Sequence, residues 1–328
     1  MPPATTAAKK KPAPKKLVAG PTRSLPAAGV KGSVAMYLGD CREAARRIPE
    51  VAQRKVRLVF ADPPFNWNRA YDEWKDSMPD REYCDVTETF REAGSEAKSF
   101  TMRWLDLCVG ALTDDGSIWV NIPDTWAAEI VVYLKERHRL HMVNWCAWHY
   151  RFGQNTTKRF INSKVHALYF CRDPQNRVWN TADILETSDR RAIYGDARTE
   201  SKRDGMPPGL RVPMDVWYGP YWGRIQGNNK ERRPYHDNQL PEVYLERVIL
   251  ACSNPGDVVL DPFIGSGTTA VVAREHGRHF VGTEFSKKNL EGAFERCGIG
   301  MLRKGLAAGV STAIHPKRRL RTLGTLDE

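Results

Sequence analysis

The amino-acid sequence predicts a doubly wound α/β fold, in which a mostly parallel sheet carries helices on both faces. Two observations support this prediction. Short apolar runs of strand length alternate with longer amphipathic segments of helical length, a pattern typical of parallel sheets. One apolar run also leads through a glycine-containing turn into a helical segment, as strand–loop–helix units do. The 328 residues suffice for one large α/β domain with an insertion.

The expected elements follow from these runs in chain order. Apolar runs bounded by turn residues predict strands at 34–38, 56–61, 117–122, 143–150, 164–171, 257–260 and 279–283. Amphipathic runs predict helices within 41–48, 81–112, 124–138, 241–253, 267–276 and 286–297. Between 181 and 235 the alternation stops, and glycine, proline, arginine and aromatic residues dominate. This composition predicts a loop-rich insert.

The chain is therefore expected to fall into five segments. Residues 1–32 are rich in Ala, Pro and Lys and are predicted to form a disordered basic tail. The α/β domain occupies 33–180 and 236–305, with the insert 181–235 between its two halves. Residues 306–328 form a basic C-terminal tail.

The positive charge is concentrated in particular segments. The net charge is +11, of which residues 1–33 contribute seven basic residues and no acid. Within the body, residues 151–234 carry sixteen Lys and Arg against nine Asp and Glu. A basic tail often gives only nonspecific affinity for polyanions. A basic internal segment beside a chemical site points more directly to a nucleic-acid substrate.

Composition also excludes several classes of protein. No apolar run approaches the roughly 20 residues that span a bilayer, and no signal-peptide core follows the basic N-terminus. The seven cysteines are scattered, with no C-x-x-C pair and no histidine at ligand spacing. We therefore expect small core cysteines, no disulfide framework, no metal and a cytoplasmic protein.

The stretch GDVVLDPFIGSGTT, residues 256–269, predicts a ligand-binding loop. Its glycines, Gly265 and Gly267, allow a sharp turn and a close approach of the backbone to a ligand. Glu284 follows about 20 residues later, at the end of the next expected strand, where an acid accepts hydrogen bonds from ribose hydroxyls. Neither a G-x-G-x-x-G pattern nor a P-loop lysine is present. A nucleoside ligand without a phosphate site suggests S-adenosylmethionine.

A second stretch, VFADPPFNWN at residues 59–68, ends an apolar strand in an unusual way. Asp62 follows the strand directly, and Pro63, Pro64 and Phe65 come after it. Prolines cannot donate to a sheet ladder, and a carboxylate at the end of a buried strand costs free energy unless it has a partner.

Together, ADPPF and the later LDPFIGSGTT resemble the amino-methyltransferases of DNA in their permuted, β-type motif order. The resemblance covers nearly all of 33–300, and LGD (38–40), GSIWVNI (116–122) and DVW (215–217) extend it. It implies a Rossmann-like methyltransferase sheet with a catalytic half, 33–180, and a cofactor-binding half, 236–305. HDNQLP (236–241) stands where the family commonly has H-P-T-Q-K-P, so a lysine is missing from the pocket for the methionine end of the cofactor.

The resemblance also implies individual roles. Asp40 would lie near the adenine of S-adenosylmethionine, although it is also a candidate helix cap for 41–48. The remaining cofactor-binding residues would be Asp261, Phe263, Gly265, Ser266, Gly267, Thr268, Thr269 and Glu284. The catalytic residues would be Asp62, Pro63, Pro64 and Phe65.

The chemistry explains this choice of catalytic residues. The lone pair of an exocyclic amine is delocalised into the base, so the nitrogen must be pyramidalised before it attacks a methyl group. The Asp62 carboxylate and the Pro63 carbonyl could accept its two N–H groups, and Pro64 restricts Pro63 to an extended conformation. Phe65 offers a stacking face for a base that has been flipped out of the duplex.

The insert is the expected reader of the DNA sequence, with double-stranded DNA as the partner. Candidate DNA-binding residues are Arg190, Arg191, Arg198, Lys202, Arg203 and Trp217, although the aromatic residues could equally form the core of the insert. A homodimer and a cognate restriction endonuclease are further partners that the sequence by itself does not decide.

The predicted activity is therefore methylation of adenine N6 in DNA, because the leading Asp of the motif goes mostly with adenine in this family. Two alternatives stay open. The same motifs serve N4-cytosine methyltransferases, and a noncatalytic DNA-binding protein could retain the fold.

Overall fold

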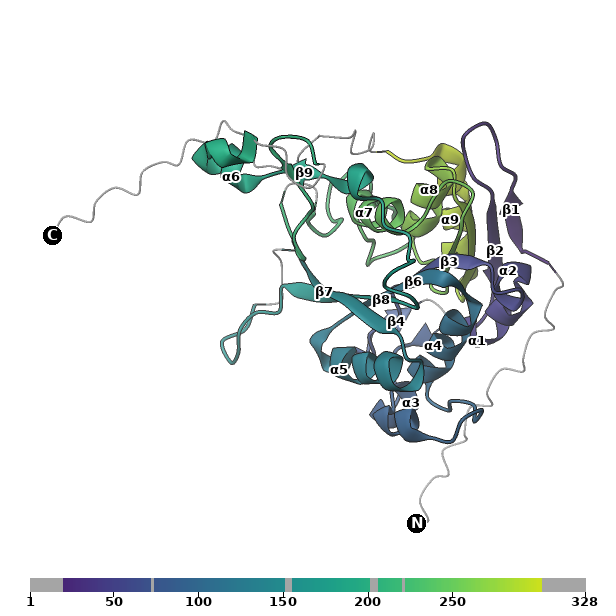
Figure 1. Cartoon of the computed structure of the whole chain (residues 1–328). Helices are drawn as coiled ribbons and strands as arrows, with labels where there is room; N and C mark the ends of the chain where they lie inside the picture. The colour runs from purple at the N-terminus through teal and green to yellow at the C-terminus, as the bar shows by residue number, and fades with distance from the viewer. Residues whose placement is uncertain (1–19, 72–73, 151–154, 201–205, 220–221, 303–328) are drawn as a thin grey trace, which may run out of the picture.

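A nine-stranded sheet forms the centre of the protein in the computed structural model, which describes residues 20–71, 74–150, 155–200, 206–219 and 222–302. The strand order is β1-β2-β13-β12-β3-β6-β8-β7-β11. The five strands from β2 to β6 are mutually parallel, whereas β8 runs antiparallel to both of its neighbours and β1 runs antiparallel to β2. The predicted sheet with helices on both faces is confirmed (Figure 1).

The elements have the following bounds. The strands are β1 (Arg23–Leu25), β2 (Val34–Leu38), β3 (Val56–Ala61), β4 (Ala70–Tyr71), β5 (Trp74–Lys75), β6 (Leu112–Ile122), β7 (His141–His149), β8 (Lys164–Cys171), β9 (Glu186–Thr187), β10 (Leu210–Arg211), β11 (Val216–Trp217), β12 (Val258–Asp261) and β13 (His279–Glu284). The α-helices are α1 (Cys41–Ala44), α2 (Pro49–Ala52), α3 (Asp80–Tyr83), α4 (Phe100–Ala111), α5 (Asp124–Val132), α6 (Asp189–Tyr194), α7 (Glu242–Cys252), α8 (Thr268–Glu275) and α9 (Lys287–Ile299). Shorter turns are η1 (Ala45–Arg47), η2 (Val86–Phe90), the π-turn η3 (Tyr133–Arg137), η4 (Thr181–Ile184) and η5 (Ala197–Glu200).

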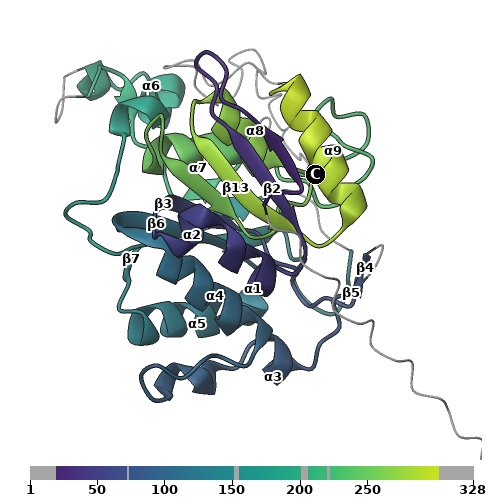
Figure 2. The ribbon, with the colours of Figure 1, turned by 90° about the vertical axis from the view of Figure 1, so that its right-hand side faces the viewer.

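Helices cover the two faces of the sheet and enclose two apolar cores. Helices α1, α2, α4 and α5 lie on one face, and α7, α8 and α9 lie on the other (Figure 2). Central strands are buried on both faces; in β3 every residue except Arg57 is apolar and buried, without polar alternation. All seven cysteines are buried, six of them in these cores, as expected for small apolar residues.

Most expected elements appear within a few residues of their predicted bounds, but the helix expected within 81–112 does not form as one piece. It is divided into α3, η2 and α4. Gly94 lies in the interruption with a left-handed backbone, φ 84°. Helical periodicity across this segment was therefore misleading, because turn residues separate its parts.

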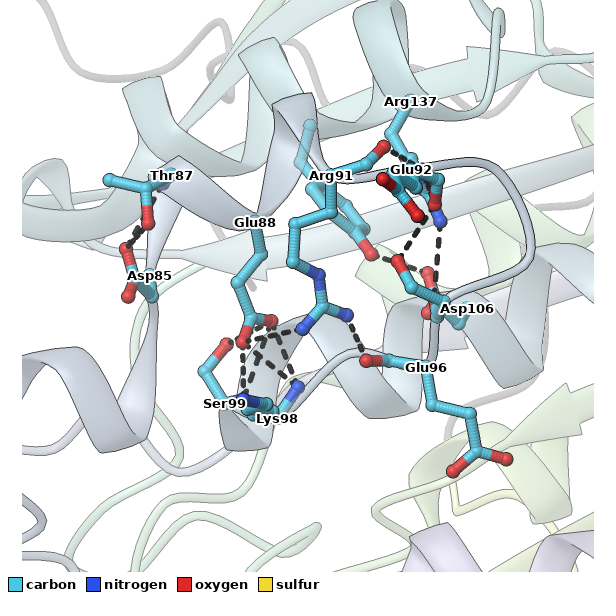
Figure 3. Close-up of polar contacts among 12 residues, drawn as sticks. Asp85, Thr87, Glu88, Arg91, Glu92, Glu96, Lys98, Ser99, Asp106 and Arg137 are labelled. Carbon is cyan, nitrogen blue, oxygen red and sulfur yellow. Dashed lines mark hydrogen bonds and ion pairs between the residues drawn. The ribbon is translucent and has the colours of Figure 1, made fainter.

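Buried Glu88 stabilises the loop that precedes α4 (Figure 3). Its carboxylate accepts hydrogen bonds from the backbone N–H groups of Lys98 and Ser99, and from the Ser99 hydroxyl. These bonds hold the chain where α4 begins, and the first residue of α4 is Phe100. The loop thus determines where the Phe100 ring lies relative to the carboxyl edge of the sheet.

The prediction of disorder is wrong for residues 20–32. Strand β1 pairs antiparallel with β2, and the Thr22 hydroxyl accepts a hydrogen bond from the Leu38 N–H. Arg23 also forms an ion pair with Glu291 of α9 at 2.8 Å. Composition does not reveal this strand, because its stability comes from pairing with a sheet edge and not from an apolar core of its own. Residues 1–19 and the C-terminal tail from 303 lie outside the described residues.

The insert is not separate from the sheet, because its strand β11 pairs parallel with β7 and extends the sheet by one strand. Trp217, in this strand, is 4% exposed and contacts the rings of Trp119, Trp222 and Tyr244. Its indole N–H donates to the Met214 carbonyl. The prediction that Trp217 binds DNA is therefore wrong, since neighbouring aromatic side chains enclose it.

We predict that Trp217→Ala lowers the free energy of unfolding by about 3–5 kcal/mol, the usual range for deleting a buried large aromatic side chain. Urea denaturation measures this change. Tyr218→Ala is the matched control, because the neighbouring Tyr218 is 46% exposed and its loss should have little effect on stability. Unchanged stability of the Trp217 variant, together with weakened DNA binding, would contradict the assignment to the core.

Candidate active site

Polar side chains stand at the carboxyl ends of five neighbouring parallel strands. In the sheet order β2, β13, β12, β3 and β6, they are Asp40, Glu284, Asp261, Asp62 and Asn121. Because parallel strands end at the same edge of a sheet, residues far apart in the sequence form one row here.

A cavity of about 590 Å³ opens along this row, a size suited to small organic ligands. It brings together the two motifs that the sequence singled out. The predicted site residues that line it are Asp40, Asp62, Pro63, Pro64, Phe65, Asp261, Phe263, Gly265, Ser266, Thr268, Thr269 and Glu284.

The two glycines of the loop after β12 have different tasks. Gly265 lines the cavity at φ 52°, and a Cβ atom there would lie 3.1 Å from the His236 ring. Gly267 does not line the cavity; at φ 77° it faces α9, where a Cβ atom would lie 2.7 Å from that of Ala293. The prediction that Gly267 lines the cofactor pocket is corrected accordingly, because Gly267 permits close packing of α9 against the loop.

Glu284 connects the end of β13 to the loop after β12. Its carboxylate accepts hydrogen bonds of 2.8 Å from the backbone N–H groups of Gly265 and Ser286. Burial raises the pKa of Glu284, while these hydrogen bonds oppose the rise. The side chain lines the cavity, and each of its oxygens has a second lone pair with which it could accept a further hydrogen bond.

Asp40 caps α1, which is the alternative role that the sequence allowed. Its carboxylate accepts a hydrogen bond from the Arg42 backbone N–H at 2.9 Å and forms an ion pair with the Arg42 guanidinium at 2.5 Å. Burial raises the pKa of Asp40, but the bonds to Arg42 outweigh it and the net shift is downward. Asp40 is therefore a fixed anion in the cavity wall, with Arg42 beside it.

Asp261, which is buried, and His236, which is partly buried, are titratable groups in the wall of the cavity. Burial raises the pKa of Asp261 to about 7, against hydrogen bonds from the Thr269 side chain and the Phe263 N–H. Burial lowers the pKa of His236 to about 4, so its ring is neutral near pH 7. This part of the wall therefore contains no fixed positive charge from histidine.

Asp62 is held by a chain of hydrogen bonds that sequence patterns missed. The Asn121 amide donates to the Asp62 carboxylate at 2.6 Å, and the Tyr244 hydroxyl donates to the Asn121 carbonyl oxygen at 3.2 Å. Burial raises the pKa of Asp62 to about 7; the Asn121 bond opposes the rise and the Asp261 charge adds to it. Asn121 ends an apolar strand just as the acids do, and this signal could have identified it.

The backbone after Asp62 leaves one carbonyl available. The Tyr83 hydroxyl donates to the Pro64 carbonyl at 2.7 Å, and the Trp126 indole donates to that of Phe65 at 3.1 Å. Among the described residues, none donates a hydrogen bond to the Pro63 carbonyl. Asp62 and Pro63 thus present two adjacent acceptors, one of which is uncommitted.

The side of the cavity away from Asp40 and Glu284 is aromatic and basic, and of its residues the sequence predicted only Phe65. Phe65 packs edge to face against Trp67 at 5.1 Å, and Trp148 packs the same way against Tyr150 at 5.3 Å. Further residues lining this region are Arg69, Arg224, Asn238 and Val165. They come from separate loops and strand ends with no shared local pattern, so only folding brings them together.

The predicted DNA-binding arginines of the insert do not line the cavity. Arg190, Arg191 and Arg198 are exposed in and next to α6, which lies at the periphery in Figure 1. Arg190 and Arg198 form ion pairs with Asp196, at 3.4 and 2.9 Å. Lys202 and Arg203 lie outside the described residues.

Comparison with known proteins agrees with this arrangement. The family profile described as DNA methylase (N6_N4_Mtase) matches residues 56–295. The chain belongs to the DNA methylase family. It is 27% identical over 256 residues to the Type II methyltransferase M.HpaI of Haemophilus parainfluenzae, covering 78% of this chain and 72% of that protein. It is 30% identical over 245 residues to the Type II methyltransferase M1.MboII of Moraxella bovis, covering 73% and 88%.

Solved structures share the fold. The PvuII DNA methyltransferase, described as cytosine-N4-specific, matches with a TM-score of 0.54 at 15% identity over 79% of this chain and 84% of that one. M1.HpyAVI matches with a TM-score of 0.50 at 17% identity over 80% and 97%. This DNA methylase therefore has the predicted methyltransferase fold, and its family confirms the expectation of S-adenosylmethionine as the cofactor.

Two further findings concern the described part of the methylase. None of its helices is long and apolar enough to cross a membrane. Across those same residues, no group of three or more His, Cys, Asp or Glu side chains could hold a metal ion.

We predict that Asn121→Ala moves the pH dependence of methyl transfer upward. Below a pH of about 7, Asp62 is mainly protonated. Above that pH the carboxylate is ionised, and an ionised carboxylate accepts a stronger hydrogen bond from an amine N–H group. Removing the Asn121 bond destabilises the ionised form, so the pKa rises and the transfer rate increases only at higher pH. Single-turnover rates between pH 5 and 9 measure the midpoint.

Tyr244→Phe is the matched control for this experiment. It removes the hydroxyl that contacts Asn121 but leaves the amide on Asp62, so its midpoint should stay near that of the wild type. Identical midpoints for the Asn121 variant and the wild type would mean that Asn121 does not set the ionisation of Asp62.

Proposed function

We propose that this DNA methylase transfers a methyl group from S-adenosylmethionine to the N6 amine of an adenine flipped out of double-stranded DNA. One observation carries the proposal. The Asp62 carboxylate and the uncommitted Pro63 carbonyl lie in the wall of the same cavity as the glycine loop and Glu284. Acceptors for an amine and a site for a nucleoside thus share one enclosed space.

The residues on the β2–β12 side fit S-adenosylmethionine and do not suit a phosphorylated ligand. Asp40, Asp261 and Glu284 are three acids along this wall, which would repel phosphate but favour a sulfonium cation. We propose that Glu284 accepts the ribose hydroxyls, that Asp40 lies near the adenine, and that the Gly265 backbone approaches the ligand. When bound, S-adenosylmethionine supplies an electrophilic methyl group.

Asp62 and Pro63 would activate the target amine. Each accepts one N–H group, which draws the nitrogen away from the plane of the base and frees its lone pair. Proline at positions 63 and 64 restricts the backbone φ angles, so the Pro63 carbonyl needs little reorganisation during the reaction. Asn121 orients the Asp62 carboxylate from the next strand, at 2.6 Å.

Aromatic side chains are the proposed support for the flipped base. Phe65 and Trp67 lie on the same side of the cavity as Trp148 and Tyr150. Asp62 stands between this side and the acids that would hold the cofactor. Stacking on such rings compensates for part of the stacking that the base loses when it leaves the duplex.

The choice of adenine rests on the leading Asp62, which in the resembling family goes mostly with adenine. Cytosine N4 is the alternative, because its amine also stands beside a ring nitrogen and offers the same two N–H groups. The PvuII enzyme carries cytosine-N4-specific in its description, but at 15% identity it informs on the fold alone.

We also propose that Arg190, Arg191, Arg198, Lys202 and Arg203 contact DNA from the insert. Their positive charge and peripheral position suit phosphate contacts. The Type II description of M.HpaI and M1.MboII supports a role beside a cognate restriction endonuclease. The homodimer stays a prediction.

We predict that substitutions of two acids at the carboxyl edge of the sheet, Asp62 and Glu284, affect different steps. Asp62→Ala should reduce methyl transfer by about 100- to 1000-fold, as loss of one preorganised group does, while cofactor affinity stays nearly unchanged. Glu284→Ala should instead weaken cofactor binding, because ribose acceptors and the contact that holds the Gly265 loop are lost together. Calorimetry with S-adenosylmethionine and single-turnover assays separate the two effects. Wild-type turnover in the Asp62 variant would refute its role, and absence of cofactor binding by the wild type would favour a noncatalytic protein.

We predict that DNA methylated by this enzyme contains N6-methyladenine. The DNA is isolated from a methylation-free host that expresses the chain, digested to nucleosides and analysed by mass spectrometry. DNA from the same host expressing the Asp62→Ala variant is the control. Detection of N4-methylcytosine without N6-methyladenine would replace adenine by cytosine as the target.

A further inference from the structure

Two arginines converge on one neutral oxygen in the wall of the cavity. Arg69 donates to the side-chain oxygen of Asn238 at 2.6 Å, and Arg224 donates to the same oxygen at 3.0 Å. All three residues line the cavity and are partly buried. Arg69 comes from the loop after Phe65, Arg224 from the insert, and Asn238 from the segment before α7. Three separate parts of the chain therefore form one basic cluster.

Neither arginine has a carboxylate partner among the described residues. Asp76, an acid that lines the cavity and follows Arg69 in the sequence, accepts hydrogen bonds from the backbone N–H groups of Trp67 and Arg69 instead. Burial lowers the pKa of Arg224, and the neighbouring charge of Arg69 lowers it further. Two like charges held side by side and partly desolvated are unfavourable unless an anion joins them. The arrangement thus favours an anionic ligand with several oxygens.

The cluster lies on the side of the cavity where the flipped base is proposed to bind. The Arg224 guanidinium sits over the Tyr150 ring at 5.4 Å, and Tyr150 directly follows β7. Strand β7 is three positions from β3 in the sheet, or roughly 14 Å at the usual strand spacing. Asp40, Glu284 and Asp261 lie on the opposite side of β3. The proposed ribose acceptors are therefore well separated from Arg224.

We propose that Arg69 and Arg224 bind a backbone phosphate of the DNA strand whose base enters the cavity. Guanidinium groups make strong charge-assisted bonds to phosphate oxygens, and two of them can hold one phosphate from two directions. Asn238 orients both groups without neutralising them. This inference rests on the proposed entry of a flipped nucleotide, but it holds for adenine and for cytosine alike.

The aromatic surroundings favour a nucleotide over the carboxylate of the cofactor as the ligand. Arg69 lies over the Trp67 ring at 5.9 Å; both rings beside the arginines, Trp67 and Tyr150, line the cavity, and Trp67 is 40% exposed. A nucleotide joins a flat base to a phosphate a few ångströms away, which matches rings and guanidinium groups in one wall. The cluster would fix the position of the extruded nucleotide relative to Asp62.

Three variants test the proposal, after the methylated sequence has been identified. Arg69→Met and Arg224→Met remove the charges but keep most of each side chain. Asn238→Asp keeps both arginines and supplies an internal counter-ion in the place of the phosphate. Arg54→Met is the matched control, because Arg54 precedes β3 and so lies at the opposite end of that strand from Asp62, with a 57% exposed side chain.

Duplex affinity is measured by fluorescence anisotropy at several salt concentrations, and S-adenosylmethionine affinity by calorimetry without DNA. Each of the three cluster variants should weaken duplex binding by about 10- to 100-fold, as expected for loss of a bond to a charged group. The slope of log affinity against log salt should become shallower by about one for each lost phosphate contact. Cofactor affinity should stay at the wild-type value, which also shows that the variants are folded.

The phosphate that the cluster binds is identified with a series of duplexes, in each of which one backbone phosphate is replaced by a neutral methylphosphonate. The wild type should lose affinity at a single position near the target base, and Arg224→Met should lose no further affinity at that position. Weaker cofactor binding without DNA in the Arg224 variant would assign the cluster to the cofactor and overturn the proposal. Equal methylphosphonate effects in wild type and variant, or a duplex affinity of Asn238→Asp equal to that of Arg54→Met, would also overturn it. These measurements do not depend on which base is methylated.

Discussion

The parallel arrangement of five strands is the constraint on which the site depends. Strands β2, β13, β12, β3 and β6 point the same way, so all of their carboxyl ends meet at one edge. The chain leaves each strand at this edge, and polar residues there can face a cavity without interrupting the apolar cores on either face. Asp62 and Asp261 are separated by about 200 residues in the sequence, yet their strands are adjacent.

The row of acids carries an electrostatic consequence. Burial raises the pKa of both Asp62 and Asp261 to about 7, and each charge would make ionisation of its neighbours harder. A cationic ligand beside them would favour their ionised forms. Binding of a sulfonium cofactor would therefore favour the ionised form of Asp62, which is the form that accepts a hydrogen bond from the amine in the proposed function.

The segment 236–240 connects the two sides of the cavity. His236 packs against Gly265, Asn238 contacts Arg69 and Arg224, and the Leu240 carbonyl accepts a hydrogen bond from Thr268. A displacement of this segment would change the cofactor loop and the basic cluster together. Leu240 stands where the family commonly has lysine, and the positive charge near this segment comes from arginines of other loops.

The sequence by itself determined seven of the nine strands of the central sheet, the order of the two motifs and twelve residues of the cavity wall. It could do so because a strand end, a pair of prolines and a glycine turn are local features, each visible within about ten residues. The tertiary structure alone decided which residues meet across the sheet. It enclosed Trp217 in an aromatic core, turned Gly267 toward α9, paired β1 with β2, and placed Asn121 against Asp62. It also joined Arg69, Arg224 and Asn238. These contacts depend on strand order and loop packing, which no local pattern of residues encodes.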